Sequence, residues 1–531
     1  MSKDILFGDE ARVKMVKGLN TVANAVKATL GPKGRLVVFK KNNFTYSTTK
    51  DGVTVAKQID LKDEFENAGA QIMKQVASQT VAQAGDGTTT SCVLAQAIVN
   101  EGMKMMAAGH DPINLKRGID LAVKEVVNFI SQAATQVQSS NDIKAVGTIS
   151  ANGDESIGSL LANALDKVGN DGLLMLEEGG GSETQLEVVQ GYFFDRGYLS
   201  PYFSTNQEKL ETVFADANIL IVDKDINNLN VMIPFLEKYL KAAKGAPLLM
   251  IADNVVGDAL SVLIVNRVKS GLPICAVRSP GFGNRRKEML QDIAILTGAT
   301  VVSEEVGLRL EDCDLNVLGQ ASKIIVNNDS TTIIEGNGDE EAIMGRIAQL
   351  RSVITDETND HTRKQLQERL AKLASGIGII KVGGSSDLEI GERKDRIDDA
   401  LHATKAAIKS GVVPGSGVMF LRSIHVLDNL NVPEELSFGV SIVKNALKAP
   451  ATQILSNAGT DTSVVINNIL NNDNTTYGYN SATGEYQDLV QSGVLDPALV
   501  LTTSLTNAAS VASLLITTEV IIVDELEEVK Q

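Results

Sequence analysis

The stretch AQAGDGTTTSCVLAQ, residues 82–96, places one carboxylate between two glycines and follows them with four consecutive hydroxyl side chains. The apolar spacing on both sides is typical of helices, so the stretch joins two of them. Glycine lets backbone N–H groups approach an anion closely, and a helix N-terminus offers unpaired N–H groups to phosphate. The hydroxyls can cap the second helix and also donate to phosphate oxygens. These features predict a phosphate cradle.

Asp86 conflicts with such a cradle, because a carboxylate and a phosphate repel each other. A divalent cation between them removes the conflict, and Mg²⁺ is commonly held by one or two carboxylates, phosphate oxygens and water. The sequence therefore predicts Asp86 as a Mg²⁺ ligand. For the loop in isolation an alternative stays open, in which a glycine ends one helix and a threonine caps the next. The chain has no GxxxxGK[ST] or GxGxxG motif, which excludes the P-loop class and gives no support to a dinucleotide fold.

Two more glycine-rich stretches, residues 29–34 (TLGPKG) and 411–417 (GVVPGSG), also interrupt helical sequence. Three such loops could surround one nucleotide. Asp51, in a turn, and Asp399, on the polar face of a helix, could each orient a water for attack on a γ-phosphate, since phosphoryl transfer depends mainly on positioning and charge neutralisation. An ordinary solvated aspartate is the competing interpretation for both.

Bulk composition limits the class of protein. A chain of 531 residues predicts about three or four domains. The formal net charge of −17 argues against nucleic acid or an anionic membrane as the main partner. The three cysteines are widely spaced without a CxxC pair, which favours a reducing compartment, and we expect a cytoplasmic protein. We find no signal peptide and no apolar run near the ~20 residues that span a bilayer.

The pattern along the chain predicts an α/β segment inserted into helical sequence. Helices are expected over 10–30 and most of 65–132, a hairpin over 35–49, and a turn with a short strand over 50–59. From about Gly191 to Gly376, apolar runs alternate with helices, which predicts a largely parallel sheet. The expected strands are residues 218–223, 247–252, 273–279 and 300–305, and the expected helices are residues 227–243, 255–271 and 285–298. Long helices return after 385, and the two glycines mark hinges.

Many blocks between Lys3 and about Asp524 resemble group I chaperonins, the bacterial GroEL type of the 60 kDa chaperonin family. They include TLGPKGR, KDGVTVA, AGDGTTT, GTISANGDE, FDRGYLSPYF, PGFGNRRKEMLQDIAILTG, IIKVGG, DALHATKAA and GYNSATGEY. The resemblance implies a multi-domain α and α/β fold with a discontinuous helical equatorial domain, a small α+β intermediate domain and an inserted α/β apical domain. Their implied bounds are 1–134 with 409–531, 135–190 with 377–408, and 191–376.

The resemblance also implies an activity and its partners. Such proteins capture non-native polypeptides and promote their folding in a ring-shaped chamber, driven by ATP binding and hydrolysis. We therefore expect an ATPase that uses ATP, Mg²⁺ and K⁺ and forms a homo-oligomer, with seven-membered rings and a co-chaperonin lid as further possibilities. A passive ATP-binding holdase and a small-molecule ATP-dependent transferase are the alternatives. The first would not need Asp51 and Asp399, and the second would need a polar substrate pocket.

The implied site residues fall into catalytic, metal-binding, nucleotide-binding and client-binding sets. Asp51 and Asp399 serve the attacking water, and Asp86 binds Mg²⁺. The backbones of Thr29 and Lys50 lie near K⁺. Nucleotide contacts are Thr29, Leu30, Gly31, Pro32, Lys50, Asp86, Gly87, Thr88, Thr89, Thr90, Gly415, Asn480, Ala482 and Asp496. The client groove is formed by Tyr198, Tyr202, Phe203, Ile233, Leu236, Leu260, Ile264 and Val265.

Four positions depart from the family pattern. Pro414 and Ser416 replace the usual Ala and Gly, Ser375 replaces a glycine beside the Gly376 hinge, and Thr452 replaces a basic residue at the ring–ring contact. The Gly/Met-rich tail of bacterial members is replaced by VDELEEVKQ. The departures indicate a divergent member, and they leave its ring number and its bacterial, organellar or viral origin open.

Overall fold

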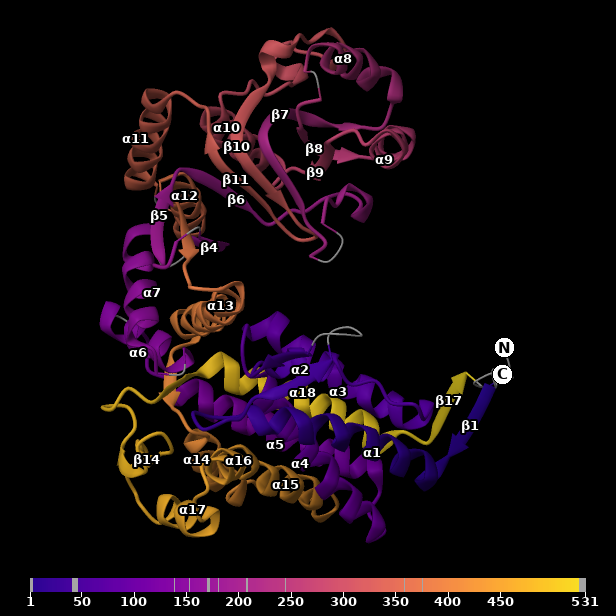
Figure 1. Cartoon of the computed structure of the whole chain (residues 1–531), viewed down its shortest axis with the longest axis vertical. Helices are drawn as coiled ribbons and strands as arrows, with labels where there is room; N and C mark the ends of the chain where they lie inside the picture. The colour runs from indigo at the N-terminus through magenta and orange to yellow at the C-terminus, as the bar shows by residue number, and fades with distance from the viewer. Residues whose placement is uncertain are drawn as a thin grey trace. The chain divides into compact units, whose positions relative to one another are not determined.

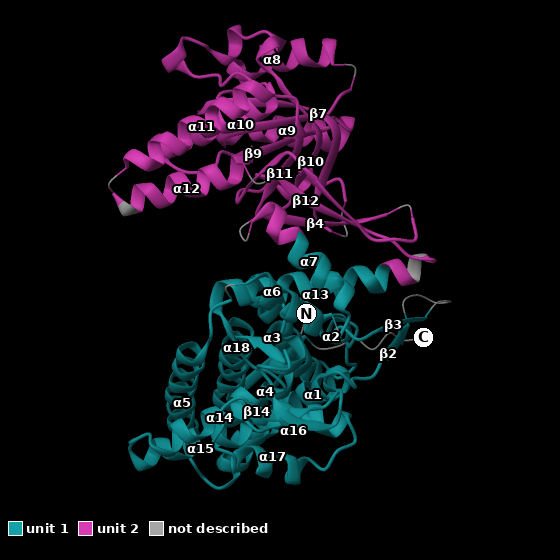
Figure 2. Ribbon diagram, turned by 90° about the vertical axis from the view of Figure 1, so that its left-hand side faces the viewer, with its two compact units in different colours: residues 1–163, 391–531 teal, residues 164–390 magenta. Residues whose placement is uncertain are grey.

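The computed structural model describes residues 3–40, 46–137, 139–151, 153–169, 172–179, 181–206, 209–243, 245–357, 359–374 and 376–524. The chain forms two compact units, and Figure 2 draws each in its own colour. Unit 1 comprises residues 1–163 and 391–531, and unit 2 comprises residues 164–390. The insertion expected from the sequence is therefore present, whereas the three-domain division stays a prediction. Ser375 lies outside the described residues.

Unit 1 is mainly helical, as its sequence pattern predicts. Its helices are α1 Gly8–Val26, α2 Gly52–Lys57, α3 Glu64–Ala84, α4 Thr88–Ala107, α5 Pro112–Ala133, α6 Ser140–Ser150, α14 Val418–Asp428, α15 Glu434–Ala446, α16 Ala449–Asn457, α17 Thr462–Leu470 and α18 Ala498–Thr517. Two more, α7 Glu155–Val168 and α13 Asp387–Ser410, run across the boundaries between the units. The helices α3, α4 and α5 all pack against α18, which lies among them in Figure 1. One large apolar core results.

Helix α18 corrects one expectation from the sequence. It has 20 residues and a mean hydropathy of 1.6, so by length and composition it could cross a membrane, and it is the one such helix in the described part of the chain. Yet 61% of the 18-residue window of α18 that has this hydropathy is buried inside the structure. Leu505, Ala508 and Ala512 are fully buried against the neighbouring helices. A central core helix has the same composition as a membrane span, because both are surrounded by apolar groups.

Four two-stranded antiparallel ribbons complete unit 1. They pair β1 Lys3–Phe7 with β17 Val520–Asp524, β2 Val37–Lys40 with β3 Tyr46–Thr49, β13 Val412–Pro414 with β16 Leu495–Pro497, and β14 Tyr477–Asn480 with β15 Glu485–Asp488. The pair β2–β3 confirms the expected hairpin. The strand expected after Asp51 is instead helix α2, because the Asp51 carboxylate accepts hydrogen bonds from the N–H groups of Val53 (3.1 Å) and Thr54 (2.8 Å) and so starts a helix.

Unit 2 is built on a six-stranded sheet in the order β6-β11-β10-β7-β8-β9. Its strands are β6 Gly191–Phe194, β7 Thr212–Ile226, β8 Leu248–Val255, β9 Ile274–Arg278, β10 Gly319–Val326 and β11 Thr331–Gly336. The pairings β7–β8 and β8–β9 are parallel, and the other three are antiparallel. The expectation of a largely parallel sheet is therefore wrong for half of it. Residues 300–305 contribute only an isolated parallel bridge between Val302 and Val222.

The remaining elements of unit 2 cover this sheet or extend from it. The helices are α8 Leu229–Ala242, α9 Gly257–Ser270, α10 Gly283–Thr297, α11 Glu340–Asp356 and α12 Asp360–Ala374, with the short 3₁₀ turn η2 Pro201–Phe203 beside α9. The three helices expected from the sequence are confirmed as α8, α9 and α10. A smaller sheet pairs β12 Ile377–Val382 with β4 Leu173–Glu178 in parallel and with β5 Gln185–Val189 in antiparallel.

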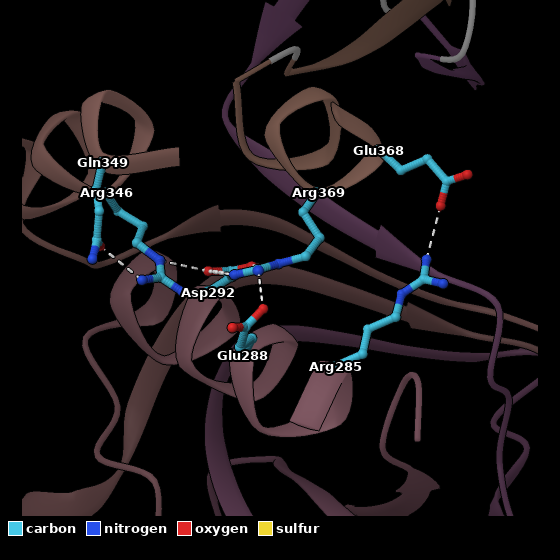
Figure 3. Close-up of polar contacts among 7 residues, drawn as sticks. All are labelled: Arg285, Glu288, Asp292, Arg346, Gln349, Glu368 and Arg369. Atoms are coloured by element: carbon cyan, nitrogen blue, oxygen red, sulfur yellow. Dashed lines mark hydrogen bonds and ion pairs between the residues drawn. The ribbon is translucent and has the colours of Figure 1, made fainter. Parts of the chain in front are cut away.

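One buried carboxylate joins three helices of unit 2. Asp292, on α10, is fully buried, and Figure 3 shows it between two guanidinium groups. Arg369, on α12, makes two bonds to it, from Nε to Oδ2 at 2.9 Å and from Nη2 to Oδ1 at 3.1 Å. Arg346, on α11, donates from Nε to Oδ1 at 2.8 Å, and Arg369 also pairs with Glu288. Such paired charges tolerate burial only while every partner is present.

We expect Asp292→Ala to destabilise the contact of α10 with α11 and α12 by about 3–5 kcal/mol, because two guanidinium groups would lose their counter-charge. Since a chain of two units does not unfold in one step, the measurement is local hydrogen exchange of these three helices. The control is Glu368→Gln, which breaks the exposed 2.8 Å pair with Arg285 and should cost no more than about 1 kcal/mol. Equal protection in Asp292→Ala and wild type would contradict the prediction.

Candidate functional site

The loop between α3 and α4 is held in shape by two glycines with left-handed backbone. Gly85 (φ 74°) ends α3, and Gly87 (φ 88°) precedes α4, so Asp86 sits at a sharp reversal. A Cβ at Gly85 would lie 2.4 Å from Cβ of His402, and one at Gly87 would lie 2.5 Å from Oγ of Ser504. Both the conformation and the contacts therefore require glycine. The loop is pressed between α13 and α18.

The second glycine-rich stretch meets this loop from the other side. Oγ1 of Thr29 lies 3.3 Å from Oγ1 of Thr89, and a Cβ at Gly52 would come within 2.5 Å of the same Thr89 hydroxyl. Asn457 Nδ2 donates to the backbone carbonyl of Leu30 at 2.9 Å and so holds the stretch in place. The structure thus brings together three segments that lie far apart in the sequence, at residues 29–31, 51–54 and 86–90.

The third glycine-rich stretch is part of the β13–β16 ribbon. Val413 pairs with Asp496, and a Cβ added to Gly415 would lie 3.2 Å from Oδ1 of Asp496. The next residue, Ser416, has a left-handed backbone (φ 58°), a conformation that glycine adopts without strain. The glycine that the resemblance leads us to expect at this position therefore has a physical reason, and the serine found here keeps the turn at some cost in strain.

Four carboxylates gather around the loop. Loss of hydration raises the pKa of Asp86, and Asp51 adds to the shift, while the Gly87 N–H and His402 oppose it. Loss of hydration also raises the pKa of Asp399 to about 8, with the charges of Asp86 and Asp51 contributing, although this side chain keeps contact with solvent. The pKa of Asp496 rises to about 7 from burial and from the charge of Asp86. A bound cation would relieve all of this repulsion.

The donor set fits a cation shared with a phosphate ligand. Among the described residues, no group of three or more His, Cys, Asp or Glu side chains is close enough to hold a metal by itself. One carboxylate at a glycine loop matches Mg²⁺, which keeps several waters and takes phosphate oxygens as further ligands. Asp86 is the residue placed to supply that carboxylate.

Other predicted nucleotide residues make no hydrogen bond or ion pair with these carboxylates in the described part of the chain. Lys50 is exposed just before Asp51. Asn480 and Ala482 form the turn between β14 and β15, where Asn480 Oδ1 accepts from the Ala482 N–H at 3.0 Å. The roles of these residues stay predictions.

His402 is a site residue that the sequence analysis did not name. It lies one helical turn after Asp399, its Nε2 is 3.7 Å from Oδ1 of Asp398, and its ring packs over Gly85. The sequence feature that could have revealed His402 is its position three residues after Asp399, since residues three apart share a helix face.

The eight residues expected to bind clients differ in exposure. Tyr202 and Val265 are 66% and 47% exposed, and Ile233, Leu260 and Ile264 are half-buried. By contrast Tyr198, Phe203 and Leu236 are buried in the core of unit 2, so in this conformation they support the surface from beneath instead of forming it. Exposed apolar groups that the sequence analysis did not name extend the face, namely Leu240 on α8 and Val268 on α9.

Comparison with known proteins identifies the family. A model of the TCP-1/cpn60 chaperonin family matches residues 22–233 and 235–525. The chain belongs to the TCP-1/cpn60 chaperonin family. The chaperonin fold extends over the whole chain: two crystal structures of the chaperonin gp146 from bacteriophage EL 2 (Pseudomonas aeruginosa), both in the presence of ATP-BeFx, are 23% identical to it. Each match covers 98% of this chain and 99% of the other, with TM-scores of 0.74 and 0.67.

Membership of this chaperonin family implies ATP-dependent protein folding. It confirms the resemblance stated from the sequence at the level of the family, while the group I assignment stays a prediction.

The raised pKa values predict a pH-dependent stability of the metal-free and nucleotide-free chaperonin. Asp399 and Asp496 hold protons in the folded chain at a pH where the unfolded chain has released them, so the folded state binds more protons between about pH 4 and about pH 8. The free energy of unfolding therefore falls as the pH rises through this window. We expect Asp399→Asn to make that fall shallower in thermal melts of unit 1.

The matched control is Asp428→Asn, which removes a carboxylate on the surface of the same unit and should leave the slope unchanged. A wild-type melting temperature that does not decline between about pH 5 and about pH 8 would contradict the assignment of these pKa values.

Proposed function

We propose that this chaperonin is a group I, GroEL-type subunit that hydrolyses ATP at the loop between α3 and α4, which carries Asp86. It would use the cycle of ATP binding and hydrolysis to fold captured polypeptides. The observation that carries the proposal is the meeting of residues 29–31, 51–54 and 86–90 in unit 1, with the charge of Asp51 acting on Asp86 and the charges of both acting on Asp399. A concentration of unpaired carboxylates at a glycine loop suits a cation–phosphate ligand and little else.

The residues divide into two roles. Gly87 and the α4 N-terminus, with the hydroxyls of Thr88, Thr89 and Thr90, would hold the phosphates through N–H and O–H donors. Asp86 would hold Mg²⁺, which when bound supplies the positive charge that neutralises the triphosphate. K⁺ near the backbones of Thr29 and Lys50 belongs to the same proposal.

Asp51 and Asp399 would position and deprotonate the attacking water. Asp51 is fixed, because its carboxylate already accepts from two N–H groups and from Oγ1 of Thr54 (2.6 Å). Asp399 has no such anchor among the described residues, and its raised pKa suits a group that takes up a proton. Asp496, Asn480, Ala482 and Gly415 would line the base and ribose, with Leu30, Gly31 and Pro32 on the other side.

The client surface would be the exposed apolar groups of α8, α9 and η2. Apolar side chains at Tyr202, Leu240, Val265 and Val268 can hold any segment that exposes apolar residues, which suits a binder of many clients. Assembly into homo-oligomeric, seven-membered rings and use of a co-chaperonin lid are part of this proposal. The three cysteines are free and buried, which supports a reducing, cytoplasmic location.

Asp399→Ala should leave nucleotide binding nearly unchanged and slow ATP hydrolysis by about 100-fold or more, the usual effect of losing a general base. Asp86→Ala should instead weaken Mg²⁺-dependent nucleotide binding. Calorimetry measures binding, and phosphate release measures turnover. The control is Asp398→Ala, which removes the neighbouring carboxylate on the same helix and should keep substantial turnover. Wild-type turnover in Asp399→Ala would refute the catalytic role and favour the passive holdase.

Tyr202→Glu should abolish capture of a denatured client and spare the ATPase, because a charge would replace an exposed apolar group on the face formed by η2 and α9. The measurement is suppression of aggregation of a chemically unfolded protein. Val353→Glu places the same charge at an exposed valine of α11, on another element of unit 2, and should keep capture intact. Undiminished capture by Tyr202→Glu would remove this surface from the proposal.

A further inference from the structure

A large cavity lies behind the ribbon that carries the candidate nucleotide residues. Its volume is about 1190 Å³, more than the roughly 300–1,000 Å³ of typical small-molecule pockets, and all of its lining residues belong to unit 1. Pro414 and Leu495, which pair across the β13–β16 ribbon, both line it. Their neighbours Gly415 and Asp496 do not, because successive residues of a strand face opposite sides. The cavity is thus separate from the nucleotide site.

Most of the cavity wall is apolar. Phe129 and Ala133 come from α5, Met419 and Ile424 from α14, and Leu470 from the end of α17. The ring of His425 meets that of Phe129 edge-on at 5.1 Å between centroids and closes one side. A site of this size with such a wall favours a ligand with a substantial apolar body.

Most charged groups on the wall already have a bonded partner. Lys444 pairs with Asp428. Arg422 donates to the backbone carbonyls of Asn472 and Asn474, both at 2.6 Å, and to that of Tyr477 at 3.2 Å. These bonds use its terminal nitrogens, and its buried Nε finds no acceptor in the described part of the chain.

Lys448 is the exception. It lines the cavity, is half-buried, and has no ion-pair partner recorded among the described residues. Asp142, the remaining acid on the wall apart from Asp473 beside Arg422, caps helix α6 by accepting from the Ser139 N–H at 3.0 Å. The wall thus carries three cations (Arg422, Lys444 and Lys448) and three carboxylates (Asp142, Asp428 and Asp473), and Lys448 is the cation among them without a recorded partner, beside an apolar space. A half-buried charge of this kind favours a ligand that brings a single opposite charge.

We propose that this cavity binds an amphipathic monocarboxylate, with its apolar body between α5 and α14 and its carboxylate on Lys448. The chemistry selects one anionic head group and an apolar chain or ring. It does not suit a polyphosphate, for which the wall offers neither a glycine loop nor a cluster of free cations. This proposal does not depend on the nucleotide site.

The chain contains no tryptophan, so one introduced residue reports on the cavity alone. We would measure fluorescence of Phe129→Trp in the full-length protein during titration with a dibrominated fatty carboxylate, because bromine quenches tryptophan only on contact. Bound molecules on the apolar surface of unit 2 would give no signal. Val490→Trp, at a 40% exposed position on the cavity wall, is the second reporter in case the first does not fold.

We expect saturable quenching whose apparent Kd rises about tenfold when Lys448→Met is added, the effect of losing one charge-assisted hydrogen bond. The matched dibrominated fatty alcohol should bind about tenfold more weakly and should not respond to Lys448→Met. Lys124→Met, which removes an exposed charge from α5 outside the cavity, should leave the Kd unchanged. Absence of saturable quenching from both reporters, or equal affinity for acid and alcohol, would overturn the proposal.

Discussion

Repulsion among four carboxylates is the constraint on which unit 1 depends. Asp51, Asp86, Asp399 and Asp496 come from separate parts of the chain, and each of the last three has a raised pKa because it loses part of its hydration and has negative charge beside it, although Asp399 keeps contact with solvent. A fold does not gather such groups for its own stability, since ionised carboxylates without partners destabilise it. A bound cation would reduce the repulsion among these carboxylates and so stabilise the arrangement.

Glycines keep the carboxylates together, because they let the backbone that carries Asp51 and Asp86 lie directly against neighbouring helices. Gly52, Gly85 and Gly87 each lie where a Cβ would collide with a neighbouring element: α4, α13 and α18 respectively. The backbone of the loop is therefore fixed by contacts on several sides, and the groups that would touch phosphate are placed by the ends of long helices. Precise placement of donors and charges is what phosphoryl transfer requires from a protein.

The sequence predicted those features that depend on residues close together in the chain. The loop around Asp86 and the helices flanking it follow from glycine conformation and apolar period, and both were correct. Asp51 was expected before a strand, but its capping bonds start a helix, a local signal that the alternation of Val53 and Val55 obscured. The antiparallel half of the large sheet could not be predicted, because strand neighbours depend on contacts between residues distant in the chain. For the same reason the sequence could not show that Phe203 is buried while Tyr202, beside it, is exposed.

Helix α18 has a consequence for how the chain is made. Its partners α3, α4 and α5 precede it by several hundred residues, and they leave the ribosome long before residues 498–517. Unit 2 is continuous from 164 to 390 and can fold during synthesis, whereas unit 1 must wait for its central helix. Until then the earlier helices expose the apolar faces that α18 will cover, and α18 itself emerges as a segment hydrophobic enough to enter a membrane. A member of the chaperonin family thus passes through an aggregation-prone state during its own biogenesis.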